Sequence, residues 1–173
     1  MSEDLRYPIG KFDRSAVNGT RHAEYLQAIE RLPEALAAAV KGLSDAELDT
    51  PYRPGGWTVR QAVHHIADSH MNAFCRFKLA LTEDAPTIRP YFEDRWAGTA
   101  DNRSAVDDSL SMIKGLHARW SALLNSMSDA DLARTLDHPE SGTWTLEQML
   151  ALYAWHGDHH TAHITGLRER QGW

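Results

Sequence analysis

Four histidines crowd into eight residues near the end of the chain, in the stretch YAWHGDHHTAH of residues 153–163. They form two overlapping pairs at spacing i, i+4, which are His156 with His160 and His159 with His163. On a helix, either pair would project from one face with its side chains about 6 Å apart, close enough to share a divalent metal ion. Because two histidines seldom hold a metal ion alone, the stretch predicts a metal site only if a third ligand comes from elsewhere in the fold.

The composition limits which functions such a site could serve. The chain has 173 residues, 42% of them hydrophobic and 24% charged, as expected for one soluble globular domain over residues 1–173. A formal net charge of −6, with scattered lysines and arginines, argues against a nucleic-acid surface. Cys75 is the only cysteine, which excludes an internal disulfide and a Cys-rich zinc site. The polar start lacks a signal peptide's apolar segment and no apolar run could span a membrane, so we expect a cytoplasmic protein.

An internal repeat indicates which elements would position the histidines. Residues 43–61 read LSDAELDTPYRPGGWTVRQ and residues 127–148 read MSDADLARTLDHPESGTWTLEQ. Each begins with Ser-Asp-Ala-acid-Leu, passes through a Pro/Gly loop and ends on Gly-x-Trp-Thr-aliphatic-x-Gln. Two motifs in the same order indicate a duplication of a unit of roughly 85 residues.

Capping motifs in the repeat predict where helices begin. Thr58 and Thr145 each stand three residues before a glutamine, a strong capping box, and Ser44 and Ser128 begin weaker ones. The helices behind the threonines should cover about residues 59–82 and 146–170. Each half also has a helix before its Ser-Asp-Ala motif, over about residues 16–42, with Pro33 inside it, and about 104–126. With almost no strand signal, the sequence predicts an all-α four-helix bundle of two related helix pairs.

The third ligand should come from the helix expected at residues 59–82. Counted from the capping threonines, His65 lies one helical turn before the position of His156, so related helices packed face to face would bring His65 near His156 and His160. Periodicity alone leaves this assignment open, because His70 follows the apolar stripe of its own helix better than His65 does.

The chain resembles the YfiT branch of the DinB-like superfamily over essentially its whole length. The resemblance rests on GGWTVRQAVHHIADSHMN at residues 55–72 and ALYAWHGDHHTAHI at residues 151–164, with RYPIG near the start and QGW at the end. It implies a four-helix bundle, generally dimeric, with one metal-binding histidine from the second long helix and an HxxxH pair from the last. Here these are His65, His156 and His160, which would hold one zinc or nickel ion per subunit.

The other histidines have structural explanations that we favour over metal binding. His70 is expected to be a satisfied core histidine. His159 and His163 are expected to lie beside the ligands or at the surface. His64 can pair with the carboxylate of Asp68, four residues later.

Two carboxylates are weak candidates for a general base. Asp68 and Asp158 are nearest in sequence to the expected ligands. Asp68 could instead orient a ligating imidazole, since metal-bound histidines usually donate their second N–H to an acceptor.

Three functions are compatible with such a site. Open coordination positions favour a metal-dependent hydrolase that uses a metal-activated water molecule on a small-molecule substrate. The superfamily resemblance adds a transferase of a low-molecular-weight thiol, such as bacillithiol or mycothiol, held as a thiolate. The third function is a non-enzymatic metal-binding stress protein.

The connection at residues 83–102 has two interpretations. Its side chains could line a pocket mouth and recognise an anionic group, or the segment could be a packed crossover or a dimer contact. The side chains in question are Arg89, Tyr91, Arg95 and Trp96.

Overall fold

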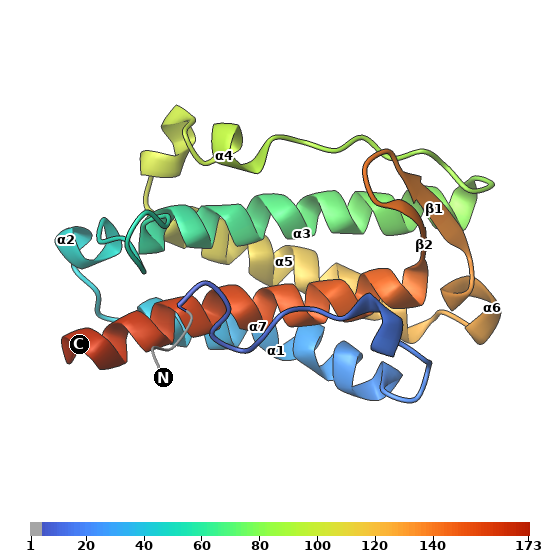
Figure 1. Cartoon of the computed structure of the whole chain (residues 1–173), viewed down its shortest axis with the longest axis horizontal. Helices are drawn as coiled ribbons and strands as arrows, with labels where there is room; N and C mark the ends of the chain where they lie inside the picture. The colour runs from blue at the N-terminus through green and yellow to red at the C-terminus, as the bar shows by residue number, and fades with distance from the viewer. Residues whose placement is uncertain (1–4) are drawn as a thin grey trace.

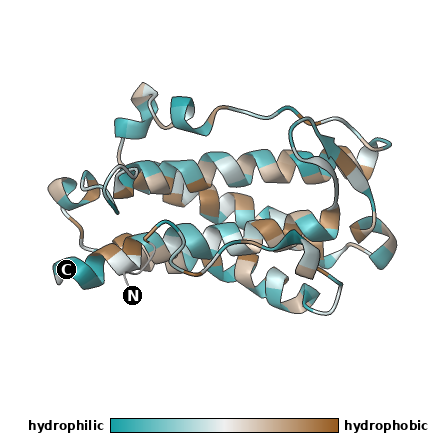
Figure 2. Ribbon diagram, in the orientation of Figure 1, coloured by the Kyte–Doolittle hydropathy of each residue, from teal (hydrophilic) through white to brown (hydrophobic). Residues whose placement is uncertain are grey.

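Four long helices make up most of the computed structural model, which describes residues 5–173 (Figure 1). They are α1 (His22–Val40), α3 (Val59–Thr82), α5 (Val106–Asn125) and α7 (Leu146–Gln171). The all-α four-helix bundle predicted from the sequence is therefore confirmed. In Figure 2 brown and teal segments alternate along the long helices, as expected where one face of a helix is hydrophobic and the other polar. No helix of the described residues is long and apolar enough to cross a membrane.

Capping boxes begin the two longest helices, as predicted. The Thr58 side chain accepts a hydrogen bond from the backbone N–H of Gln61, whose own side chain reaches back to the Thr58 N–H. Thr145 and Gln148 make the same pair of bonds at the start of α7. The short helices α2 (Asp45–Leu48) and α6 (Asp129–Leu132) also start with capping boxes.

The helices are connected in an order that requires a long crossover. Both α1 and α3 pack against α5 and α7, and Figure 1 shows α3 and α5 running in the same direction, opposite to α1 and α7. Because α3 and α5 are parallel, the chain between them must return along the whole bundle. The segment after α3 does this, and contains α4 (Glu93–Trp96) and a short 3-10 helix, η2 (Ala100–Arg103).

Two details differ from the sequence-based expectation. The first long helix begins at His22 and not near residue 16, because a turn with Gly19 at φ +79° separates it from a 3-10 helix, η1 (Arg14–Ala16). A hairpin also forms from β1 (Thr135–His138) and β2 (Gly142–Thr145). The same place in the first half carries a single bridge between Pro51 and Thr58. The second loop is three residues longer, so the two segments that flank it can pair over more residues.

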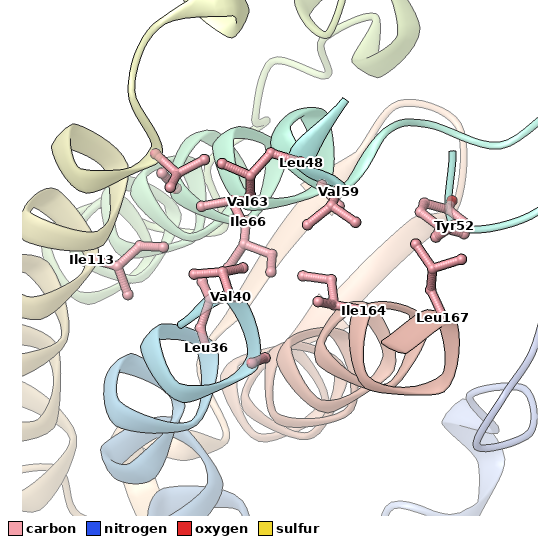
Figure 3. Packing of buried hydrophobic residues seen from close by; sticks show 14 of the residues in the cluster. Leu36, Val40, Leu48, Tyr52, Val59, Val63, Ile66, Ile113, Ile164 and Leu167 are labelled. Carbon is pink, nitrogen blue, oxygen red and sulfur yellow. The ribbon is translucent and has the colours of Figure 1, made fainter. Parts of the chain in front are cut away.

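The hydrophobic core consists of two clusters. Figure 3 shows the first, in which Leu36 and Val40 of α1 meet Val63 and Ile66 of α3 and Ile164 of α7. The second lies further along the bundle and is built around aromatic and aliphatic side chains that include Phe77, Trp120, Leu146, Leu150 and Tyr153. On α7 the histidines of residues 156–163 fall between the two clusters. On α3, His70 lies between them, whereas His64 and His65 lie within the stretch that carries the first cluster. The bundle therefore holds a layer of imidazoles where the two apolar clusters meet.

Candidate metal centre

Three histidines from two helices converge in this layer. His65 comes from α3, and His156 and His160 lie one turn apart on α7. Their ligand nitrogens all lie within 4.8 Å of one another, and the Nε2 atoms of His65 and His156 are 3.0 Å apart. Among the described residues no other group of three or more histidine, cysteine, aspartate or glutamate side chains comes together in this way. The structure thus brings together the three residues that the family resemblance selected.

These imidazoles are neutral at physiological pH because they are removed from water. Burial lowers the pKa of His65 to about 4. Burial first, and then the neighbouring imidazoles, hold the pKa values of His156 and His160 well below the usual 6.5. A neutral imidazole keeps a lone pair on one ring nitrogen, the form that binds a metal ion. The donor set of three neutral imidazoles without a thiolate or carboxylate therefore fits zinc or nickel.

Trp57, just before the α3 cap, forms one wall of the site. Its ring lies 4.5 Å from that of His65 and stacks at 6.1 Å on that of His160, measured between centroids. The indole N–H donates to Asp94 of α4 at 3.2 Å. The tryptophan thus connects the candidate ligands to the long crossover, a role that its position before the helix cap did not indicate.

His70 is fully buried, as expected of a core histidine, and both of its ring nitrogens are hydrogen-bonded to other histidines. One partner is the candidate ligand His156, at 3.2 Å, and the other is His117 of α5, at 3.0 Å. His117 was not among the site residues predicted from the sequence. Its spacing from Ile113 and Trp120 places it on the apolar stripe of α5, which is the signal that could have identified it.

The second i, i+4 pair is buried as well, and it does not lie at the surface. The Nε2 atoms of His159 and His163 are 3.1 Å apart. His159 stacks on Trp155, with ring centroids 4.4 Å apart, and His163 stacks on Tyr52 at 4.1 Å. This pair packs beside the candidate metal centre without a third ligand from the described residues.

The two candidate carboxylates lie outside the cluster of ligands. Asp158 forms an ion pair with Arg31 of α1 and faces a different cavity. Burial, and then the charge of Asp101, raise the pKa of Asp68 to about 6. Within residues 5–173 no hydrogen bond joins the Asp68 carboxylate to an imidazole, and the expected pairing with His64 is wrong. The reason is that His64 is hydrogen-bonded to Ser109 and to the Ser104 carbonyl, across the bundle.

A cavity of about 490 Å³ lies under the crossover, one helical turn along α3 and α7 from the candidate ligands. Its lining includes Ser69, one turn after His65, and Tyr153, one turn before His156. Asp94, which accepts the Trp57 hydrogen bond, is part of its wall. The crossover and the hairpin supply the rest of the lining, from Pro90, Tyr91, Phe92, Glu93, Arg95, His138 and Glu140. The segment is therefore a crossover, and of the four side chains considered for a pocket mouth, Tyr91 and Arg95 line this cavity while Arg89 and Trp96 do not.

Arg76 lines this cavity without a carboxylate at ion-pair distance. Burial raises the pKa of Glu93, which lines the same cavity, and the charge of Arg76 opposes this rise. Arg76 is 9% exposed, and its hydrogen bonds go to the neutral Tyr153 hydroxyl at 3.0 Å and the Arg89 carbonyl at 3.5 Å. No carboxylate of the described residues lies within the 4.0 Å of an ion pair. Arg60, the other buried arginine in this part of the chain, is paired with Asp45 and Asp49, each at 2.7 Å. A buried guanidinium is normally paired in this way, so Arg76 is the exception that needs an explanation.

The comparisons with known proteins agree with this fold and name metal-dependent relatives. The family model of the DinB superfamily matches residues 28–164. Proteins of Bacillus mycoides (strain KBAB4) and Bacillus cereus (strain 03BB102) are 55% and 54% identical, over 99% and 98% of this chain and 99% of each relative. Both carry the name "Putative metal-dependent hydrolase". YfiT from Bacillus subtilis, described as "a probable metal-dependent hydrolase with an unusual four-helix bundle topology", superposes with a TM-score of 0.93 at 48% identity, over 98% of each chain. The chain therefore belongs to the DinB superfamily.

Proposed function

We propose that this protein is a metal-dependent hydrolase in which His65, His156 and His160 hold one zinc or nickel ion. The observation that supports this most directly is the convergence of three neutral imidazoles, without a fourth protein ligand from the described residues. Structural zinc sites are usually closed by a fourth protein ligand, whereas catalytic sites keep an open position. The names of the relatives point to the same class of activity.

The protein residues would bind and orient the reactants. A bound divalent ion would supply Lewis-acid polarisation of a substrate oxygen and lower the pKa of a water molecule. Trp57 and the two apolar clusters limit the access of bulk water, which strengthens electrostatic interactions within the site. Neither Asp68 nor Asp158 is placed by a hydrogen bond to serve the site, so we assign neither as a general base.

We further propose that the substrate is a small molecule with a carboxylate or similar anionic group that pairs with Arg76. The cavity volume lies in the range of small-molecule sites. Arg76 is held in place by Tyr153 and the Arg89 carbonyl, so its guanidinium is already oriented for an oxyanion. The ester or amide group of the substrate would then extend one helical turn along α3 and α7 towards the metal centre.

The test compares zinc-loaded wild type with Arg76→Met on a panel of activated esters and amides, with and without a carboxylate. A charge-assisted hydrogen bond contributes about 1.5–3 kcal/mol. The variant should therefore lose roughly 10- to 150-fold in kcat/KM on carboxylate substrates and little on neutral ones. Arg119→Met is the matched control, because Arg119 is an exposed arginine on the same bundle whose guanidinium lies over Phe74.

The same assay, repeated with and without a low-molecular-weight thiol, separates the alternatives. Metal-dependent hydrolysis without thiol supports the proposal. Conversion that requires both metal and thiol would contradict it in favour of a thiol transferase. Failure of all substrates, by a protein that still binds metal, would favour a metal-binding protein without this activity. An equal loss on neutral and anionic substrates would contradict the role given to Arg76.

A further inference from the structure

We propose that His117 and His70 are positioning residues that fix the orientation and protonation of His156, the central ligand of the metal centre. We call His117, His70 and His156 the histidine network. The proposal rests on the metal site proposed above, but its first test needs no metal. It explains why three imidazoles, from α5, α3 and α7, are joined end to end where two apolar clusters meet.

The network starts at a helix defect that the sequence encodes. Pro33 lies inside α1 and has no backbone N–H. The carbonyl of Ile29, four residues earlier, therefore lacks its usual helical donor. The Nδ1 atom of His117 lies 2.7 Å from this carbonyl oxygen and supplies the missing hydrogen bond across the bundle. A carbonyl oxygen can only accept, so Nδ1 of His117 must carry the proton.

Counting donors and acceptors from this anchor sets the proton positions along the network. His117 is 1% exposed and His70 fully buried, without a carboxylate partner in the described part of the chain, so both rings are neutral. With the His117 proton on Nδ1, its Nε2 accepts from Nδ1–H of His70, at 3.0 Å. Nε2 of His70 then accepts from Nδ1–H of His156, at 3.2 Å.

The outcome is a His156 ring with its proton directed away from the metal centre. Its Nε2, which faces Nε2 of His65 at 3.0 Å, is left with a free lone pair. This is the form that a metal ion requires, and the hydrogen bond to the other nitrogen also fixes the plane of the ring. Trp120 and Tyr153 hold the middle of the network, since both rings meet that of His70 edge to face, at centroid distances of 5.8 and 5.3 Å.

The His117 end of this arrangement does not tolerate reversal. If Nε2 of His117 carried the proton, its Nδ1 would face the Ile29 carbonyl as a second acceptor, and the 2.7 Å contact would become repulsive. The Ile29 carbonyl that Pro33 leaves without a donor thus determines which nitrogen donates in each hydrogen bond of the histidine network.

The first experiment reads the proton positions directly. Long-range ¹H–¹⁵N NMR of the full-length protein distinguishes Nδ1–H from Nε2–H imidazoles, with histidine variants used for assignment. We expect His117, His70 and His156 to carry Nδ1–H, both in the metal-free protein and after addition of Zn²⁺. A predominant Nε2–H form of His70 or His156 in the metal-free protein would overturn the proposal, whether or not the protein binds metal.

The second experiment measures the affinity for Zn²⁺ by competition with a chromophoric chelator. His117→Leu removes the anchor and should weaken binding about 10- to 100-fold, the range found for partners of metal-bound histidines. His117→Gln, which can still donate to the Ile29 carbonyl and accept from His70, should restore most of the affinity. His64→Leu is the matched control, because it deletes another buried histidine that links α3 to the start of α5.

The outcomes separate positioning from general stability. His117→Leu should move the His156 proton to Nε2 in the metal-free protein, while His64→Leu leaves both the proton and the affinity near wild type. Equal losses of affinity in the Leu variants at 117 and 64, or wild-type affinity in His117→Leu, would overturn the proposal. Absence of Zn²⁺ binding by the wild type would contradict the proposed function. The NMR measurement would still show whether the protons of the histidine network lie on the predicted nitrogens.

Discussion

Mild acid should destabilise the metal-free protein, because its buried histidines must take up protons on unfolding. Seven histidines of the described residues are less than 9% exposed, and their pKa values are lowered by burial. They are His64, His65, His70, His117, His159, His160 and His163. In the unfolded chain each would bind a proton near pH 6.5. Their stabilising contribution is therefore complete above pH 6.5 and is lost as the pH falls towards the native pKa.

The magnitude follows from the two histidines with defined values. The native pKa is about 4 for His65 and about 3 for His163. Between pH 7 and pH 5, linkage to an unfolded pKa of 6.5 removes about 1.8 kcal/mol of stability for each. Asp68 acts in the opposite direction: its native pKa of about 6 returns about 1.3 kcal/mol over the same interval. The other buried histidines add to the loss, so a large part of a typical stability of about 5–15 kcal/mol should disappear.

Urea denaturation followed by circular dichroism, in EDTA and at constant ionic strength, measures this loss in half-unit steps from pH 7 to pH 5. His163→Leu is the informative variant, because its ring packs on Tyr52 and it is not a proposed ligand. The variant should show a pH-dependent loss smaller than that of the wild type by about 1.8 kcal/mol. A stability that is constant or increases from pH 7 to pH 5 would refute the reasoning, because it would mean that these imidazoles are not buried in the neutral form.

Three substitutions test individual parts of the fold. Gly157→Ala places a Cβ 2.6 Å from the buried Leu32 side chain. Overpacking should outweigh the gain in helix propensity and lower the free energy of unfolding, measured by urea denaturation, by about 1–2 kcal/mol. An increase in stability would contradict this packing. Thr145→Ala removes the cap that Gln148 completes on α7 and should lower the free energy of unfolding by about 1 kcal/mol, whereas an unchanged value would mean that the cap contributes nothing. Cys75→Ser changes an exposed side chain and should alter stability by less than about 0.5 kcal/mol with no change in metal content; loss of metal would show that the thiol is needed.

The elements of the fold could be predicted well because their signals are local. The two threonine capping boxes and the uninterrupted apolar periodicity placed α3 and α7 almost to the residue. The hairpin was missed because four-residue strands leave no periodic pattern long enough to recognise. The start of α1 was misplaced because the turn at Gly19 interrupts a segment whose composition is compatible with a helix.

The candidate site was predictable only in part because its chemistry depends on pairings between helices. Both His65 and His70 point inward, and periodicity could not show that one joins the ligand cluster while the other supports it. The role of His117 depends on a carbonyl of α1 that Pro33 leaves free, 88 positions away in sequence. Arg76 attracts notice only when its surroundings show that its hydrogen bonds go to a hydroxyl and a carbonyl and not to a carboxylate. Such features follow from three-dimensional neighbours, which spacing along one helix does not encode.

The metal content of untagged protein tests the central claim most directly. Mass spectrometry should find close to one zinc or nickel ion per chain in the wild type and in His159→Ala, whose imidazole pairs with His163 beside the centre. The ion should be lost in His65→Ala and in His160→Ala, since each removes one of only three donors. Metal retained in His65→Ala and lost in His159→Ala, or no metal in the wild type, would contradict the account.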